Sequence, residues 1–215
     1  ATYGGGVCTD SEQTVKFSMS GGSIAGCVAS IIGGGVRASG TFKMSGQAVI
    51  RSCTAESATQ FVCGGGVYVN GSSSFEMSDT AIIEGCQAIS TSAYGGGVYV
   101  SSSSSFVMTA KAEIEGCRAI SNSANSSKGG GVHLANATTF TLSGSAVIQN
   151  CTATNSVNSG KAYGGGVSAL VCGRSPWRTT RALPAVLRQT EADYTSPALS
   201  YLAMGNFSPT AARLT

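Results

Sequence analysis

The chain returns six times to the tetrapeptide Gly-Gly-Gly-Val at nearly constant spacing. The copies begin at Gly4, Gly33, Gly64, Gly95, Gly129 and Gly164, which lie 29, 31, 31, 34 and 35 residues apart. A period of this size marks a repeat architecture, in which each unit buries its apolar face only by stacking on its neighbours. The period therefore predicts a solenoid.

Two further motifs recur between the glycine triplets: Phe-x-Met/Leu and Ile-x-x-Cys-x-Ala. In one unit they are Phe106 with Met108, and Ile114 with Cys117 and Ala119. The distance from Phe to Cys is 10 residues in the first unit and 11 in the other four. Apart from this one residue, length varies only before the Phe and after the Cys-x-Ala, so we expect loops at these two places.

Within a unit the apolar residues alternate, as in Val98-Tyr99-Val100 and Phe106-Val107-Met108. Period two predicts strands, and each unit offers three short ones separated by Gly-rich or Ser-rich turns. Three strands in about 30 residues are typical of one coil of a parallel β-helix, with coils roughly 4.8 Å apart. We therefore expect an all-β, right-handed parallel β-helix of about five coils of ~31 residues over residues 1–167.

Residues 168–215 do not continue the repeat. All four prolines and the only Trp lie in this tail. Three interpretations stay open: a cap on the last coil, a disordered segment, or an out-of-frame product of a frameshift. The nucleotide sequence of the gene would distinguish them, because another frame that encodes the repeat motifs would exclude a cap.

Composition excludes several partners. The net charge is +3, but residues 1–167 hold eight basic and eight acidic residues, and no basic stripe follows the repeats. Nucleic acid is therefore not an expected partner. The apolar runs are too short to span a bilayer. The chain starts in mid-repeat, so we expect a fragment of a longer array that is monomeric as a fragment, with no cofactor or metal.

Five of the eight cysteines occupy one position in successive units: Cys27, Cys53, Cys86, Cys117 and Cys151. We expect them to be buried, reduced thiols that act as small apolar side chains. Their spacing does not resemble that of a zinc site. Cys8, Cys63 and Cys172 lie outside this ladder, and we expect exposed or loop thiols there.

The layout of Gly95–Val98 followed by Ile114–Cys117 resembles the repeat of the polymorphic outer-membrane proteins, which are chlamydial-type autotransporter passengers. That family carries Gly-Gly-Ala-Ile/Leu/Val and Phe-x-x-Asn, so this chain differs by a third Gly, by Ile for Phe and by Cys for Asn. The resemblance covers about residues 1–169. It implies a β-helical adhesin or surface antigen, outer-membrane associated or secreted, that binds a host or neighbouring-cell protein or glycan. It brings no catalytic residues.

A carbohydrate-active enzyme, either a polysaccharide lyase or a glycoside hydrolase, is the alternative, because β-helices also serve such enzymes. The best candidates are Glu84 and Glu115, which would stack at roughly 5 Å, near the carboxylate spacing of retaining glycosidases. Arg51 would flank Glu84. A solvated face explains these residues better, since neither an aromatic sugar platform nor a long cleft-forming loop accompanies them. We therefore expect no enzymatic activity.

The middle residue of the Val-x-Val strand varies from coil to coil. Arg37, Tyr68, Tyr99 and His133 should be exposed neighbours on one strand face, where they form the candidate binding surface. His133 is the only His and lacks any catalytic signature. The alternative explanation is that Tyr simply suits an exposed strand.

Overall fold

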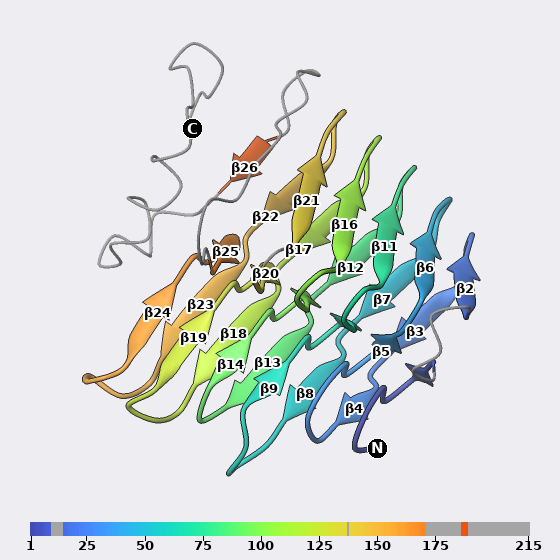
Figure 1. Ribbon diagram of the computed structural model, residues 1–215. Coiled ribbons are helices and arrows are strands. Elements are labelled where there is room, and N and C mark those ends of the chain that lie inside the picture. Colours follow the sequence, from blue (N-terminus) through green and yellow to red (C-terminus); the bar gives the residue numbers. More distant parts are fainter. Residues whose placement is uncertain (10–14, 137, 171–185, 189–215) are drawn as a thin grey trace.

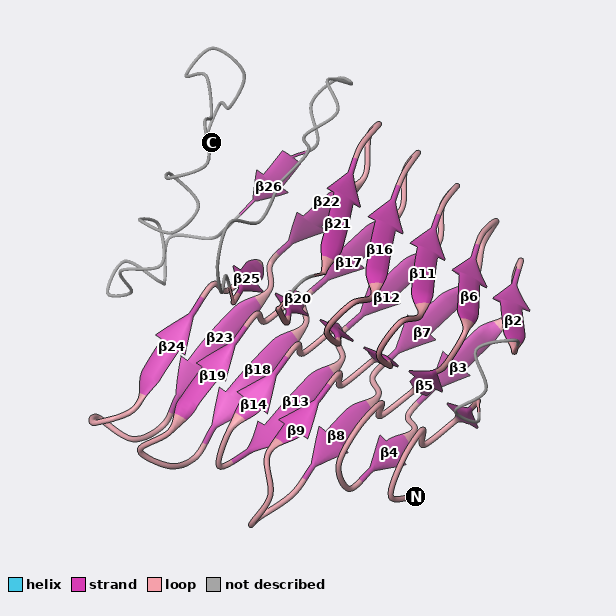
Figure 2. Cartoon of the chain, in the orientation of Figure 1, coloured by secondary structure: helices cyan, strands magenta, loops and turns pink. Residues whose placement is uncertain are grey.

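The computed structural model describes residues 1–9, 15–136 and 138–170, together with the backbone of residues 186–188. Every regular element among them is a β-strand, and every strand pairing is parallel. The coils stack side by side along one axis from the N-terminal coil to β24 and β25 (Figure 1; Figure 2). The expected right-handed parallel β-helix of about five coils is confirmed.

Equivalent strands of successive coils form five sheets, and three of these surround the main core. Sheet I contains β1 (Val7–Cys8), β5 (Val36–Ala38), β10 (Val67–Val69), β15 (Val98–Val100), β20 (Val132–Leu134) and β25 (Val167–Ala169). Sheet II contains β2 (Lys16–Met19), β6 (Thr41–Met44), β11 (Ser74–Met77), β16 (Ser105–Met108) and β21 (Thr139–Leu142). Sheet III contains β3 (Ser23–Ala25), β7 (Val49–Arg51), β12 (Ile82–Glu84), β17 (Glu113–Glu115), β22 (Val147–Gln149) and β26 (Val186–Arg188).

The other two sheets form a thinner second lobe. Sheet IV contains β4 (Val28–Ala29), β8 (Thr54–Glu56), β13 (Gln87–Ser90), β18 (Arg118–Ser121) and β23 (Thr152–Asn155). Sheet V contains β9 (Val62–Cys63), β14 (Ala93–Tyr94), β19 (Ser126–Lys128) and β24 (Lys161–Tyr163). A complete coil therefore has five strands, and the expectation of three was wrong.

The two additional strands escaped the sequence pattern because their inward residues are small. Ala88, Ser90 and Ala93 are buried between sheets IV and V, where alternation of large apolar residues is absent. The buried cluster of this lobe consists of five alanines and Val62. Small side chains let the two sheets lie close together, so the lobe is thin.

The main core lies between sheets I, II and III. Its largest side chains form ladders, and Phe42, Phe75 and Phe106 are all at most 1% exposed. Ring centroids are 4.7 Å apart for Phe42 and Phe75, 4.8 Å for Phe75 and Phe106, and 5.3 Å for Phe106 and Phe140. This spacing is the distance between neighbouring strands, which confirms the expected Phe stack on consecutive coils.

The glycine triplet forms the waist between the two lobes. Gly64 has φ of +67°, a conformation that strongly favours glycine. Gly65 is required for another reason, since a Cβ there would lie 2.2 Å from the Gln87 carbonyl oxygen. A Cβ on Gly66 would lie 3.1 Å from Ile83 Cγ2. The absence of side chains thus allows the backbone of the triplet to pass in close contact with the turn around Cys86 that joins sheets III and IV.

The repeat extends slightly beyond the expected boundary at residue 167. Strand β25 ends at Ala169, and the Leu170 amide donates to the Leu134 carbonyl at 2.9 Å. Further along the chain, β26 pairs in parallel with β22. The remainder of the tail assigned to residues 168–215 lies outside the described residues, so its three interpretations stay open.

Candidate functional site

Two columns of outward side chains flank the glycine waist. The first holds the middle residues of sheet I, in register from coil to coil: Cys8, Arg37, Tyr68, Tyr99, His133 and Ser168. The second holds the residue before each glycine triplet, also in register: Tyr3, Ile32, Cys63, Tyr94, Lys128 and Tyr163. We call the two columns together the aromatic corner.

The columns contact each other although both point away from their own sheets. The Tyr94 and His133 ring centroids are 5.4 Å apart. His133 is only 4% exposed, and Cys63 only 2%, despite their outward positions. The outer faces of sheets I and V therefore meet in a concave corner, because the glycine turn brings the end of one strand onto the start of the next.

Aromatic rings and cations pack on one another throughout the corner. Tyr68 and Tyr99 stack with centroids 5.2 Å apart and planes only 3° apart. Lys128 Nζ lies over two rings, 5.4 Å from the Tyr94 centroid and 5.7 Å from that of Tyr163. Both distances lie within the range of cation–π attraction. Arg37 makes a similar contact with the Tyr3 ring at 5.7 Å.

The corner gathers five of the seven tyrosines in the chain, and the other two lie outside the described residues. The four residues proposed from sequence are thus brought together as a continuous column. The expectation that they are exposed was wrong: Arg37, Tyr68 and Tyr99 are half-buried, and His133 is buried. The second column covers them, and sequence reasoning missed its role. A signal was available, because Tyr precedes the glycine triplet in three of the six copies.

Burial controls the ionisation of the corner. Desolvation, reinforced by the nearby Lys128 ammonium, lowers the pKa of His133 to about 4. The imidazole is therefore neutral at pH 7, and its Nδ1 is buried without a hydrogen-bond partner. Burial also raises the pKa of the Tyr68 and Tyr99 phenols, which keeps them protonated at neutral pH.

The alternative site on sheet III has the expected register. Glu84 pairs with Glu115 on the next coil and with Arg51 on the previous one. Glu115 Oε1 accepts hydrogen bonds from the side-chain amides of Asn150 at 3.1 Å and Gln149 at 3.5 Å. Among the described residues the only ion pair is Lys43 with Glu76 at 2.8 Å, so Arg51 forms no salt bridge with Glu84.

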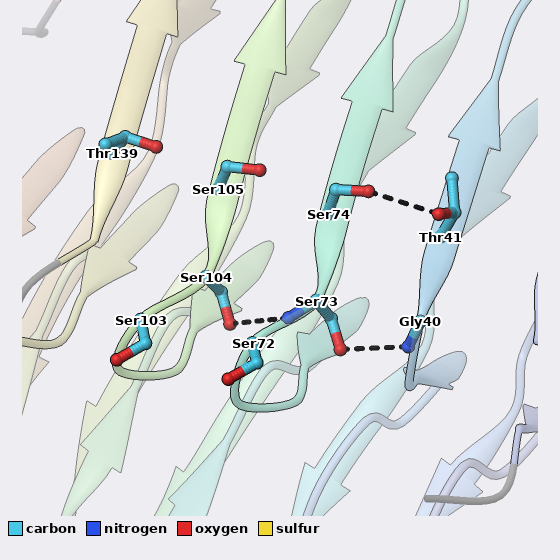
Figure 3. Close-up of a pocket in the computed structure, with 9 residues that line it drawn as sticks. All are labelled: Gly40, Thr41, Ser72, Ser73, Ser74, Ser103, Ser104, Ser105 and Thr139. Atoms are coloured by element: carbon cyan, nitrogen blue, oxygen red, sulfur yellow. Dashed lines mark hydrogen bonds between the residues drawn. The ribbon is translucent and has the colours of Figure 1, made fainter. Parts of the chain in front are cut away.

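A third feature is a polar hollow of about 320 Å³ at the turn between sheets I and II (Figure 3). It is lined by Gly40, Thr41, Ser72–Ser74, Ser103–Ser105 and Thr139. Ser73 Oγ accepts from the Gly40 amide at 2.9 Å, and Ser104 Oγ donates to the Asn70 carbonyl at 2.6 Å. These serine hydroxyls join turns of neighbouring coils, which accounts for the serine runs structurally.

The described cysteines differ in how far they are buried. All seven described cysteines are free thiols, and Cys53, Cys86, Cys117 and Cys151 are buried as expected. The expectation was wrong for Cys27, which is only half-buried because it lies in the first coil. The expectation of an exposed Cys63 was wrong, because it lies within the aromatic corner, where burial raises its thiol pKa. Cys8 is exposed as expected, and Cys172 lies outside the described residues. The part of the chain that the structure describes holds no group of three or more potential metal ligands.

Comparison with known proteins assigns no relative. No family model, curated protein or solved structure matches the chain. None of the described residues forms a helix that is long and apolar enough to cross a bilayer. Function must therefore be inferred from the chemistry of the corner itself.

Proposed function

We propose that the protein is a non-enzymatic surface protein, an adhesin or surface antigen, that binds its partner through the aromatic corner. The observation that carries the proposal is the concentration of tyrosines, the only His and two cations in one strip along the rod. Tyr and Arg are enriched among residues that anchor interfaces. The interior, by contrast, is fixed by packing and offers little freedom for recognition.

The proposed location at the cell surface or outside the cell rests on the resemblance of the repeat to the polymorphic outer-membrane proteins. The expected partner is a host or neighbouring-cell protein or a glycan. A long solenoid suits this role, since its outward residues can change from coil to coil without altering the ladders inside.

The test screens the full chain against a glycan array and a panel of host surface proteins, and assays the same glycans for release of reducing ends. For any ligand found, replacing both Tyr68 and Tyr99 by Ser should weaken binding at least about tenfold. Circular dichroism should remain β-rich, because both residues are outward.

The matched control replaces Glu84 and Glu115 by Gln. Both lie on the outer face of sheet III, away from the aromatic corner, so ligand binding should be unchanged. Sugar release that this control abolishes would overturn the proposal and establish the enzyme alternative. Binding that survives loss of both tyrosines would also contradict the assigned site.

A further inference from the structure

Charge is segregated around the rod. The outer faces of sheets I and V carry Arg37, Lys128 and Lys161, and among the described residues they carry no carboxylate. The six described carboxylates lie on sheets II, III and IV or on the turn between II and III: Glu56, Glu76, Asp79, Glu84, Glu113 and Glu115. The aromatic corner is therefore a cationic strip on an otherwise mixed surface.

No described carboxylate pairs with the cations of the corner. Among the described residues Lys43, which pairs with Glu76, is the only cation in an ion pair, so no described residue neutralises Arg37 or Lys128. Arg37 Nη1 donates to the Thr9 carbonyl at 3.4 Å, and its Nε is buried without a partner. His133 Nδ1 is a second buried polar atom without a partner in the same strip. These groups favour a ligand that supplies anionic and hydroxyl oxygens.

Ring contacts fill the middle of the corner. Tyr68 and Tyr99 cover one another, Tyr99 and Tyr94 both contact His133, and Lys128 lies over Tyr94. A ligand therefore meets ring edges, phenol hydroxyls and cations. Ligands that depend on stacking against a free aromatic face, such as neutral sugars or nucleic-acid bases, are disfavoured.

We propose that the ligand of the aromatic corner is a linear acidic glycan, one that carries carboxylate or sulfate groups, lying along the solenoid axis. This inference rests on the proposed function and names its ligand class. Arg37 and Lys128 are three coils apart, roughly 14 Å along the stack, so a ligand that reaches both must be extended.

Two other polymers fit less well. Single-stranded nucleic acid needs free ring faces and more phosphate contacts than the two cations of the corner supply. A peptide that adds a strand to a sheet needs a free edge, but the strands of sheets I and V are paired on both sides except at the ends of the rod. Sugar hydroxyls and acidic groups match what the corner leaves free.

The experiment measures binding of the full chain to alginate, a polyuronate, and to dextran, a neutral glucan of matched length. Alginate should bind, dextran should not, and the alginate affinity should fall as NaCl rises from about 50 to about 200 mM. Lys128→Gln and Arg37→Gln should each weaken alginate binding at least about fivefold. Lys111→Gln and Lys16→Gln, exposed cations on other parts of the rod, are the matched controls and should change it less than about twofold.

Equal binding of dextran, equal losses in the control variants, or tighter binding of single-stranded DNA than of alginate would overturn the inference. The two proposals fail separately. If alginate does not bind but another ligand is lost on replacing Tyr68 and Tyr99, the ligand class is wrong and the binding function stands. If alginate is cleaved, the proposed function itself is wrong.

Discussion

His133 illustrates how strongly one side chain depends on its neighbours in the stack. The equivalent positions on adjacent coils hold Tyr99 and Ser168, and its ring also contacts Tyr94 from the second column. These neighbours exclude water, and Lys128 adds a like charge, so the neutral imidazole is strongly favoured. Because protonation of His133 is unfavourable in the folded state, the free energy of unfolding depends on pH.

Stability should therefore fall as the pH drops from about 6.5 to about 4. The folded pKa of about 4 lies below the ordinary value of 6.5, so in this interval the unfolded chain binds a proton that the folded chain does not. The loss from His133 should approach about 3 kcal/mol at pH 4. Urea unfolding at a series of pH values measures it. His133→Gln should remove this part of the slope, and an unchanged slope in the variant would contradict the prediction.

Cysteine reactivity should also follow the tertiary environment. Cys8 is exposed and Cys63 is 2% exposed, although both lie in the aromatic corner. A thiol reagent applied to native protein should modify Cys8 at least about tenfold faster than Cys63, because burial raises the thiol pKa and blocks access. Mass spectrometry of the labelled peptides gives both rates, and labelling after denaturation provides the control. Equal native rates would mean that the corner is open.

At the scale of elements, the glycine triplet joins the two lobes by close backbone contact. Its first residue turns the chain with positive φ, and its second and third lie where any Cβ would collide with the neighbouring turn. The five strands of a coil are therefore connected through a position at which only the smallest residue fits. This requirement recurs in the first five copies of the triplet and explains the repeat most visible in the sequence.

Gly65→Ala should destabilise the fold by more than about 2 kcal/mol, because the new Cβ would lie 2.2 Å from the Gln87 oxygen and 2.4 Å from the Gly96 oxygen. Gly71→Ala is the matched control, since the nearest atom to its Cβ, the Ser102 oxygen, is 3.5 Å away. Thermal and urea unfolding of both variants measure the difference. Similar stability of the two variants would mean that the waist is looser than described.

At the scale of the whole molecule, the protein is a one-dimensional stack. Each strand pairs with the equivalent strands one coil before and after it, and the Phe ladder runs through five coils. Stability is then approximately a sum over coils and their interfaces. Whole coils should be removable, whereas fractions of a coil should not.

Deletion of residues 64–94 removes one full period of 31 residues and joins Cys63 to Gly95. The product should remain β-rich and cooperative, with a rod shorter by roughly 5 Å in solution scattering. Deletion of residues 64–78 is the control and should abolish folding, since it shifts every later ladder out of register. If both deletions unfold the chain, the coils are not independent units.

Sequence alone determined the parallel β-helix, the number of coils and the identity of the interior ladders. These depend on short-range alternation and on a fixed period, which are present in the order of residues such as Phe75, Phe106 and Phe140. The two strands of the second lobe could not be predicted, because Ala88 and Ala93 carry no alternation of large side chains.

Only the tertiary structure decided how the outward residues meet. Tyr94 and His133 lie 39 positions apart in the chain and on different sheets, yet their rings are in contact. The contact depends on the angle between sheets I and V at the glycine waist, and no local pattern encodes that angle. For this physical reason the column of Arg37, Tyr68, Tyr99 and His133 was predictable, while its burial beneath the second column was not.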